Sequence, residues 1–259
     1  MADATTGITQ ETIALRKVPL DRPWRWLASG WEDMRANMGI SLTYGVLAAI
    51  TGYFLIWGLA SLGYLYLVLP LAAGFLIMGP VLTVGLYEVS RRRQDGQSTT
   101  LSQALSAHQR NRSQIALMGV ALLLMNFLWI RIAALIFMLY FGLQPPSFEN
   151  LIVETFLVTE NLPFLVFGTF TGAVLALFTY MISVISIPLL LDRTEANVIE
   201  AITTSWRSVT YNQRAMLLWA GLIVIFTAAG IATLFLGLII VLPLIGHASW
   251  HAYKDLTDV

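Results

Sequence analysis

The chain has 259 residues, of which 57% are hydrophobic and only 12% are charged. A soluble domain usually carries about 25% charged residues, so the composition argues against an ordinary soluble protein and places the chain in lipid. The 15 basic and 15 acidic side chains balance, which argues against nucleic acid as a partner. The absence of cysteine excludes disulfides, thiolate metal sites and thiol catalysis.

The first 39 residues contain neither a long apolar run nor a small-residue cleavage site. A cleaved signal peptide has both, so we expect the first membrane span to direct insertion. We interpret residues 1–22 as a tail and residues 23–259 as a single membrane domain.

Long uncharged stretches follow at 40–58, 64–87, 115–130, 162–191 and 215–250. A helix needs about 20 apolar residues to cross a bilayer, and the last stretch is too long for one ordinary span. Splitting it between Gly230 and Gly237 predicts an all-α polytopic bundle of six transmembrane helices. Five spans, one of them very long or re-entrant, is the alternative.

The basic residues predict the orientation of these spans. With six spans, segments 1–39, 88–114, 192–214 and 251–259 lie on one side and hold 14 of the 15 Lys and Arg residues. The opposite loop, 144–161, has no basic residue and three Glu. Cytoplasmic loops are enriched in Lys and Arg, so we predict a multi-pass protein of the bacterial inner membrane with both termini cytoplasmic.

Three cytoplasmic segments, which end at Asn37, Asn111 and Asn212, resemble one another. Each has bulky apolar residues ten and six positions before its Asn, a spacing that predicts an amphipathic helix lying in the membrane interface. The three pairs are Leu27 with Trp31, Leu101 with Leu105, and Ile202 with Trp206.

The span that closes each predicted hairpin carries a late proline: Pro80, Pro188 and Pro243. Together with the interfacial segments, these prolines predict three repeat units, about 23–90, 98–192 and 194–259. Repeated units of this kind pack against their neighbours and give a compact bundle.

The third predicted span continues past residue 130 to Gly142, and two polar residues fall inside it. Arg131 lies about 24 Å along the helix from Ile115, near the outer leaflet, where a long side chain reaches the headgroups. We expect it to pair with an acidic residue of the outer loop, although a charge within a span is also a functional candidate. Asn126 is a candidate for a hydrogen bond between helices. The acidic residues of that loop are Glu149, Glu154 and Glu160.

Glu88 lies where the second span meets three arginines. Arg91 and Arg92 follow it at i+3 and i+4, which predicts salt bridges at the end of a helix.

His247, Trp250, His251 and Lys254 form one helical stripe near the C-terminus. On the six-span interpretation the stripe emerges at the cytoplasmic headgroups, where Trp beside basic residues acts as an anchor. We therefore predict an interface anchor and no cofactor. A metal or haem contact by His247 and His251 is the alternative, because histidines at i and i+4 serve as ligands on helices.

The strings "PLIGHASWHAY", "PVLTVGLYEVSRRR" and "WLASGWEDM" resemble an uncharacterised family of bacterial integral membrane proteins, defined by a domain of unknown function. Pro-x-x-Gly-His-Ala-Ser-Trp-His is the most specific of these elements. The resemblance implies an inner-membrane protein without an assigned activity. Some members are labelled putative cytochrome c oxidase components. The histidine set of a haem-copper catalytic subunit is missing here, so that label implies an accessory role.

The sequence contains no glycine-rich phosphate loop, no Ser-His-Asp order and no paired carboxylates within a span. We therefore expect a non-enzymatic scaffold or accessory subunit, which contacts the bilayer and a membrane-protein partner. One alternative is a metal- or haem-contacting accessory protein of the respiratory chain. Another is a transporter or lipid-handling protein with its path between the repeats, near Arg131.

Overall fold

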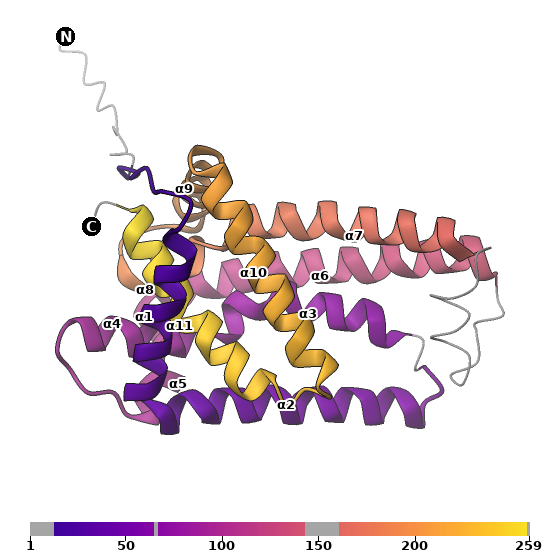
Figure 1. The fold of residues 1–259 in the computed structure, drawn as a ribbon, viewed down its shortest axis with the longest axis horizontal. Helices are drawn as coiled ribbons and strands as arrows, with labels where there is room; N and C mark the ends of the chain where they lie inside the picture. Colours follow the sequence, from indigo (N-terminus) through magenta and orange to yellow (C-terminus); the bar gives the residue numbers. More distant parts are fainter. Residues whose placement is uncertain (1–12, 65–66, 143–160, 258–259) are drawn as a thin grey trace, which may run out of the picture.

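The computed structural model describes residues 13–64, 67–142 and 161–257, and this part of the chain consists of helices joined by turns (Figure 1). In chain order the helices are α1 (Arg22–Ala36), α2 (Met38–Ser61), α3 (Val68–Leu82), α4 (Val84–Gln94), α5 (Leu101–Leu105), the 3-10 helix η2 (Ala107–Asn111), α6 (Arg112–Phe141), α7 (Leu162–Ser183), α8 (Ser186–Asp192), α9 (Val198–Tyr211), α10 (Gln213–Ala232) and α11 (Leu238–Leu256).

Within the described residues, five helical stretches are long and apolar enough to cross a membrane: 38–61, 71–94, 107–141, 162–192 and 213–232. The second joins α3 to α4 and the fourth joins α7 to α8. The prediction of a polytopic all-α bundle with about six spans is confirmed. α11, the sixth predicted span, is not among the five, because its C-terminal half carries polar and charged side chains.

The last apolar stretch divides where the sequence predicts, because α10 ends at Ala232 and α11 begins at Leu238. The two helices form a hairpin whose tip packs against α2. Phe235 contacts Gly52 of α2, which lies 14 residues after Met38, or about 21 Å along that helix. In Figure 1 the hairpin turns back beside α2, whereas α6 and α7 extend further along the molecule.

The first and third amphipathic segments form the single helices α1 and α9, whereas the second forms α5 followed by the 3-10 helix η2, and in all three the next helix starts directly after the predicted Asn. The three Asn residues share one non-helical backbone conformation: φ −125° and ψ 43° at Asn37, φ −142° and ψ 63° at Asn111, and φ −118° and ψ 37° at Asn212. A single residue with these angles redirects the chain from the interfacial helix into the span. The outer apolar residues Trp31, Leu105 and Trp206 are all exposed, as expected for helices that dip into lipid. The limits of the three repeat units stay a prediction.

In Figure 1, α1 crosses the direction of α2 steeply, at the end of the molecule that also holds α9 and the end of α11. The helix packs closely on α11, since a Cβ on Gly30 would lie 2.6 Å from the backbone nitrogen of Ala248. The ring of Trp26 packs edge-on against the ring of Trp219 of α10, with the centroids 5.8 Å apart. The indole N–H of Trp26 donates a hydrogen bond of 2.9 Å to the carboxylate of Asp255. The C-terminal half of α11 is therefore covered by protein.

Candidate functional site

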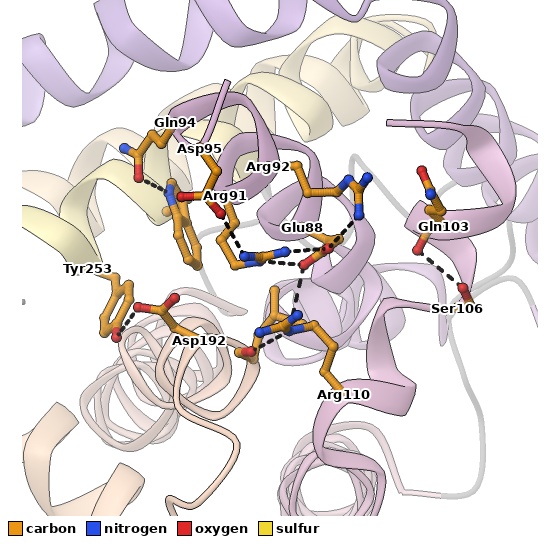
Figure 2. Close-up of polar contacts among 12 residues, drawn as sticks. Glu88, Arg91, Arg92, Gln94, Asp95, Gln103, Ser106, Arg110, Asp192 and Tyr253 are labelled. Atoms are coloured by element: carbon orange, nitrogen blue, oxygen red, sulfur yellow. Dashed lines mark hydrogen bonds and ion pairs between the residues drawn. The ribbon is translucent and has the colours of Figure 1, made fainter. Parts of the chain in front are cut away.

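The cytoplasm-facing ends of α4, α8 and α11, as the charge pattern orients them, meet in a polar cluster around Glu88 (Figure 2). Glu88 is only 4% exposed and accepts two hydrogen bonds from Arg91, at 2.8 and 2.9 Å. Arg92 lies 3.9 Å from the carboxylate, so both predicted salt bridges are present. Arg110, which comes from η2, is a third cation at 3.9 Å. The buried carboxylate is fully compensated, which buried charges require.

The same cluster links the helices of all three predicted repeats. Arg110 donates to the backbone carbonyl of Leu191 at 3.0 Å, which connects η2 to α8. Asp192 of α8 accepts from the Tyr253 hydroxyl at 2.9 Å and from Lys254 at 3.1 Å, both on α11. Figure 2 shows the contacts of Arg110 and the hydrogen bond between Tyr253 and Asp192. The arrangement holds helix ends together and leaves no charged group of this cluster unpaired.

A second polar chain surrounds His247, which is 0% exposed. Its Nδ1 lies 2.8 Å from the Ser90 hydroxyl and its Nε2 lies 2.9 Å from the Ser41 hydroxyl. Ser90 also hydrogen-bonds the carboxylate of Asp33. Because a carboxylate only accepts, Ser90 donates to Asp33 and accepts from Nδ1–H. His247 therefore carries a proton on Nδ1, and its Nε2 shares a hydrogen bond with the Ser41 hydroxyl.

Asp33 of α1 joins this chain to His251, whose Nε2 donates to the carboxylate at 2.8 Å. Arg93 of α4 also donates to Asp33. Burial by itself raises the pKa of the Asp33 carboxyl, but the hydrogen bonds and the charge of its partners outweigh burial and hold that pKa below its usual value. Asp33 is thus a carboxylate bound between α1, α4 and α11.

The structure corrects the interface-anchor interpretation of the histidine stripe. His247 and Trp250 are both 0% exposed, and Trp250 donates its indole N–H to Gln94 at 2.9 Å. The stripe faces α1, α2, α4 and α8 instead of lipid, because its four residues bond side chains of these helices. A polar stripe in sequence does not reveal whether protein or headgroups cover it.

The histidines also have protein partners at the atoms that would bind a metal. A metal or haem iron at His247 would have to displace Ser41 or Ser90, since both ring nitrogens are hydrogen-bonded. Among the described residues, no group of three or more His, Asp and Glu side chains is placed to hold a metal ion.

Arg131 and Asn126 both lie on α6, away from these clusters. Arg131 is exposed, and its predicted partners Glu149, Glu154 and Glu160 lie outside the described residues. Asn126 packs against Gly74 of α3, and its Oδ1 is buried without a hydrogen-bond partner. This oxygen makes no interhelical hydrogen bond in the described part of the chain, and the candidacy of Asn126 for such a bond stays a prediction.

An apolar cavity of about 400 Å³ lies among α3 with the start of α4, α7, α10 and α11. Two of its wall residues are glycines with room in front of them, because no neighbouring atom lies within 4 Å of a Cβ built on Gly79 or Gly221. Its rim includes Leu177 of α7 and Val224 and Ile225 of α10, all exposed on the outer surface. The cavity thus opens sideways, where a membrane protein meets hydrocarbon. Arg131 does not line it.

Sequence reasoning missed this cavity and Asp33. Asp33 is 218 positions from its partner His251, and no local pattern links them. The cavity depends on the relative placement of four helices, which a sequence does not show. The glycines Gly79 and Gly221, which interrupt runs of bulky apolar residues, are a weak sequence sign of a gap between the helices.

These features define a multi-pass, helical integral membrane protein with a polar layer at one set of helix ends and a cavity that opens on its apolar surface. Residues 67–192 match the model of a family described as "Predicted integral membrane protein (DUF2189)". The predicted resemblance to an uncharacterised membrane family is thereby confirmed. The matched segment runs from the residue before α3 to the end of α8, so it includes Glu88 and two walls of the cavity but not the histidines of α11. No curated protein and no solved structure matches the chain.

Proposed function

We propose that the protein is a non-enzymatic lipid-handling protein of the bacterial cytoplasmic membrane, with both termini in the cytoplasm. It takes up an apolar, membrane-soluble molecule in the cavity among α3, α7, α10 and α11. The observation that carries the proposal is the cavity itself, at about 400 Å³.

The size and position of the cavity favour an occupant. Packed protein interiors leave few voids larger than one water molecule, whereas ligand pockets are about 300–1,000 Å³. The exposed rim at Leu177, Val224 and Ile225 faces the surface that the bilayer covers. The molecules that can enter the cavity from that side are therefore hydrocarbon chains rather than water. A dry apolar cavity of even about 150 Å³ binds small apolar molecules.

The polar clusters favour a structural role for the cytoplasmic layer. Glu88 and Asp33 are each held by arginine and are not among the residues that line the cavity. Catalysis by acid and base groups needs such groups at the binding site, and here the walls supply only hydroxyls and hydrocarbon. A scaffold or accessory subunit, the leading interpretation from sequence, needs a partner surface, and the cavity supports lipid handling more directly.

The test compares two glycine substitutions in protein purified with mild detergent. Gly221→Phe adds a ring to the wall of the cavity, whereas Gly168→Phe adds the same ring on α7 away from the cavity, and at both positions no atom lies within 4 Å of the new Cβ. Native mass spectrometry and solvent extraction should find an apolar molecule bound to the natural chain and to Gly168→Phe, and its loss from Gly221→Phe. Equal retention by all three proteins, or no bound molecule in any of them, would refute the proposal.

A further inference from the structure

Building on the proposed function, we propose that the apolar occupant of the cavity is an acyl chain of an anionic phospholipid, whose phosphate stays outside the cavity and is bound by Arg214. The inference adds a ligand class and a binding residue to the site. Arg214 lies in the first turn of α10, the helix that forms one side of the opening of the cavity.

The walls of the cavity exclude a charged headgroup. Among the described residues that line it, the polar side chains are the hydroxyls of Ser, Thr and Tyr, and there is no Lys, Arg, His, Asp or Glu. A phosphate placed there would lose its hydration without gaining an opposite charge, which is strongly unfavourable. A phospholipid can therefore place only hydrocarbon in the cavity, and its headgroup has to be held outside.

The helices beside the opening offer one cation for that headgroup. The opening lies at the exposed residues Leu177 of α7 and Val224 and Ile225 of α10. These two helices together carry a single charged side chain, that of Arg214. It is exposed and forms no ion pair with another described residue. Its guanidinium is therefore free to bind an anion from the membrane.

Arg214 lies on the face of α10 that leads to the opening. Gly221 in the cavity wall follows it by seven residues and Ile225 on the rim by eleven, close to two and three turns of helix. The three residues therefore share one face, and the exposed Leu217 lies between them. Arg214 is about 10 Å from Gly221 along the helix, on its cytoplasmic side as the charge pattern orients the span.

A contact between the two helices separates the headgroup position from the opening. The Tyr180 hydroxyl of α7 donates to the Met216 carbonyl of α10 at 2.8 Å, on the cytoplasmic side of the opening. Arg214 lies two residues beyond this bond, where the span begins. An arginine there can donate two parallel hydrogen bonds to a phosphate, and basic residues at the cytoplasmic surface attract anionic lipids. A phosphate at Arg214 leaves the acyl chain of the same lipid beside Leu217 and the opening.

The experiment uses three lipids with identical acyl chains and a photoactivatable group at the end of one chain: phosphatidylglycerol, phosphatidylcholine and diacylglycerol. Each is titrated into the full-length chain in mild detergent, and label on the cavity walls is mapped by peptide mass spectrometry. We expect phosphatidylglycerol to label the walls at the lowest concentration and diacylglycerol at the highest. In Arg214→Gln, the preference for phosphatidylglycerol over diacylglycerol should fall by about fivefold, the value of one basic residue beside an anionic lipid.

Two variants and a competitor isolate the role of Arg214. Arg207→Gln removes the same charge from α9, where the arginine is exposed, forms no ion pair with another described residue and lines a separate hollow with Leu15. Its lipid preference should equal that of the natural chain. Arg214→Lys keeps the charge and should keep most of the preference. Glycerol phosphate, a soluble phosphate without an acyl chain, should not displace the phosphatidylglycerol probe at concentrations where unlabelled phosphatidylglycerol does.

The outcomes separate the two proposals. An unchanged preference in Arg214→Gln, an equal loss in Arg207→Gln, or displacement of the probe by glycerol phosphate as effective as by phosphatidylglycerol would overturn the present inference while leaving an apolar binding site. Absence of label from the cavity walls with every probe, or label that Gly221→Phe does not reduce, would overturn the proposed function itself.

Discussion

Asp33 and His251, 218 residues apart in sequence, are joined by a hydrogen bond of 2.8 Å between the aspartate Oδ2 and the histidine Nε2. The contact fastens the interfacial helix α1 to the last helix of the chain. Asp33 is 3% exposed and also binds Arg93, so one carboxylate connects the start, the middle and the end of the sequence. Removing this carboxylate would break contacts that join α1, α4 and α11 at once.

Replacing Asp33 with Asn should lower stability in detergent by about 2 kcal/mol, because hydrogen bonds to a charged group are worth about 1.5–3 kcal/mol and Arg93 and His251 lose their anion. The measurement is the thermal unfolding midpoint of the purified protein. Glu32→Gln is the control, since Glu32 is the neighbouring carboxylate and is exposed. Equal midpoints for the two variants would contradict a structural role for Asp33.

The lowered pKa of Asp33 predicts how the stability gap between the natural chain and Asp33→Asn depends on pH. A carboxyl whose pKa is lower in the folded state stabilises the fold fully above its unfolded pKa, here 3.8, and loses this contribution as the pH falls through the folded value. The titration of the Asp33 carboxyl should leave the difference in unfolding midpoint between the natural chain and Asp33→Asn constant from pH 7 to about 5. Below about pH 4 this difference should shrink. A gap that widens on acidification would show that the pKa is raised instead.

His247→Ala should destabilise the protein by about 2–4 kcal/mol, because it opens a cavity and leaves the Ser41 and Ser90 hydroxyls without their shared partner. His108→Ala should have almost no effect, since His108 is exposed. Zinc and iron contents and the visible absorption spectrum should be the same for both variants and the natural chain. Stoichiometric metal or haem that disappears only in His247→Ala would support the ligand alternative.

Features that depend on local composition could be predicted from the sequence. Span positions follow from apolar runs, and the break between α10 and α11 follows from Gly230, which lies so close to Leu238 that a Cβ would be 2.7 Å from its Cδ2. The chain turns at Asn37, Asn111 and Asn212 follow from the similarity of three short segments. Each of these signals lies within about ten residues of the feature that it predicts.

Features that depend on which face of a helix meets another helix could not be predicted. The stripe with His247 and Trp250 has the composition of an interface anchor, yet α1 covers it, and no sequence period distinguishes protein from headgroup as the covering layer. The cavity likewise results from the splay of four helices. One long-range contact does leave a sign in the sequence. The face of α2 that packs on the α10–α11 hairpin is a stripe of small residues, a pattern typical of close helix contacts in membranes, formed by Ser41, Gly45, Ala49 and Gly52.

The orientation of the spans can be tested directly, because the chain has no cysteine and single-cysteine variants are unambiguous. Ser147→Cys, in the loop without basic residues, should react with a membrane-impermeant thiol reagent in intact spheroplasts. Ser98→Cys, between α4 and α5, should react only after lysis, since the basic segments are expected to face the cytoplasm. The reverse pattern would place both termini outside.

The contact between α2 and the α10–α11 hairpin leads to a prediction that uses two glycines of the same helix. A Cβ on Gly45 would lie 2.2 Å from the Ile239 carbonyl oxygen, a distance that real Cβ atoms essentially never show, and the obstacle is backbone that cannot rotate away. Gly45→Ala should therefore push the hairpin off α2 and lower the unfolding midpoint.

Gly39 lies in the first turn of α2 and has no neighbouring atom within 4 Å of a Cβ, so Gly39→Ala meets no obstacle. It should leave stability unchanged or raise it by up to about 1 kcal/mol, the gain in helix propensity of Ala over Gly. The same chemical change on one helix is thus expected to have opposite signs at positions six residues apart. Equal effects of the two substitutions on the unfolding midpoint would show that the hairpin does not rest on α2.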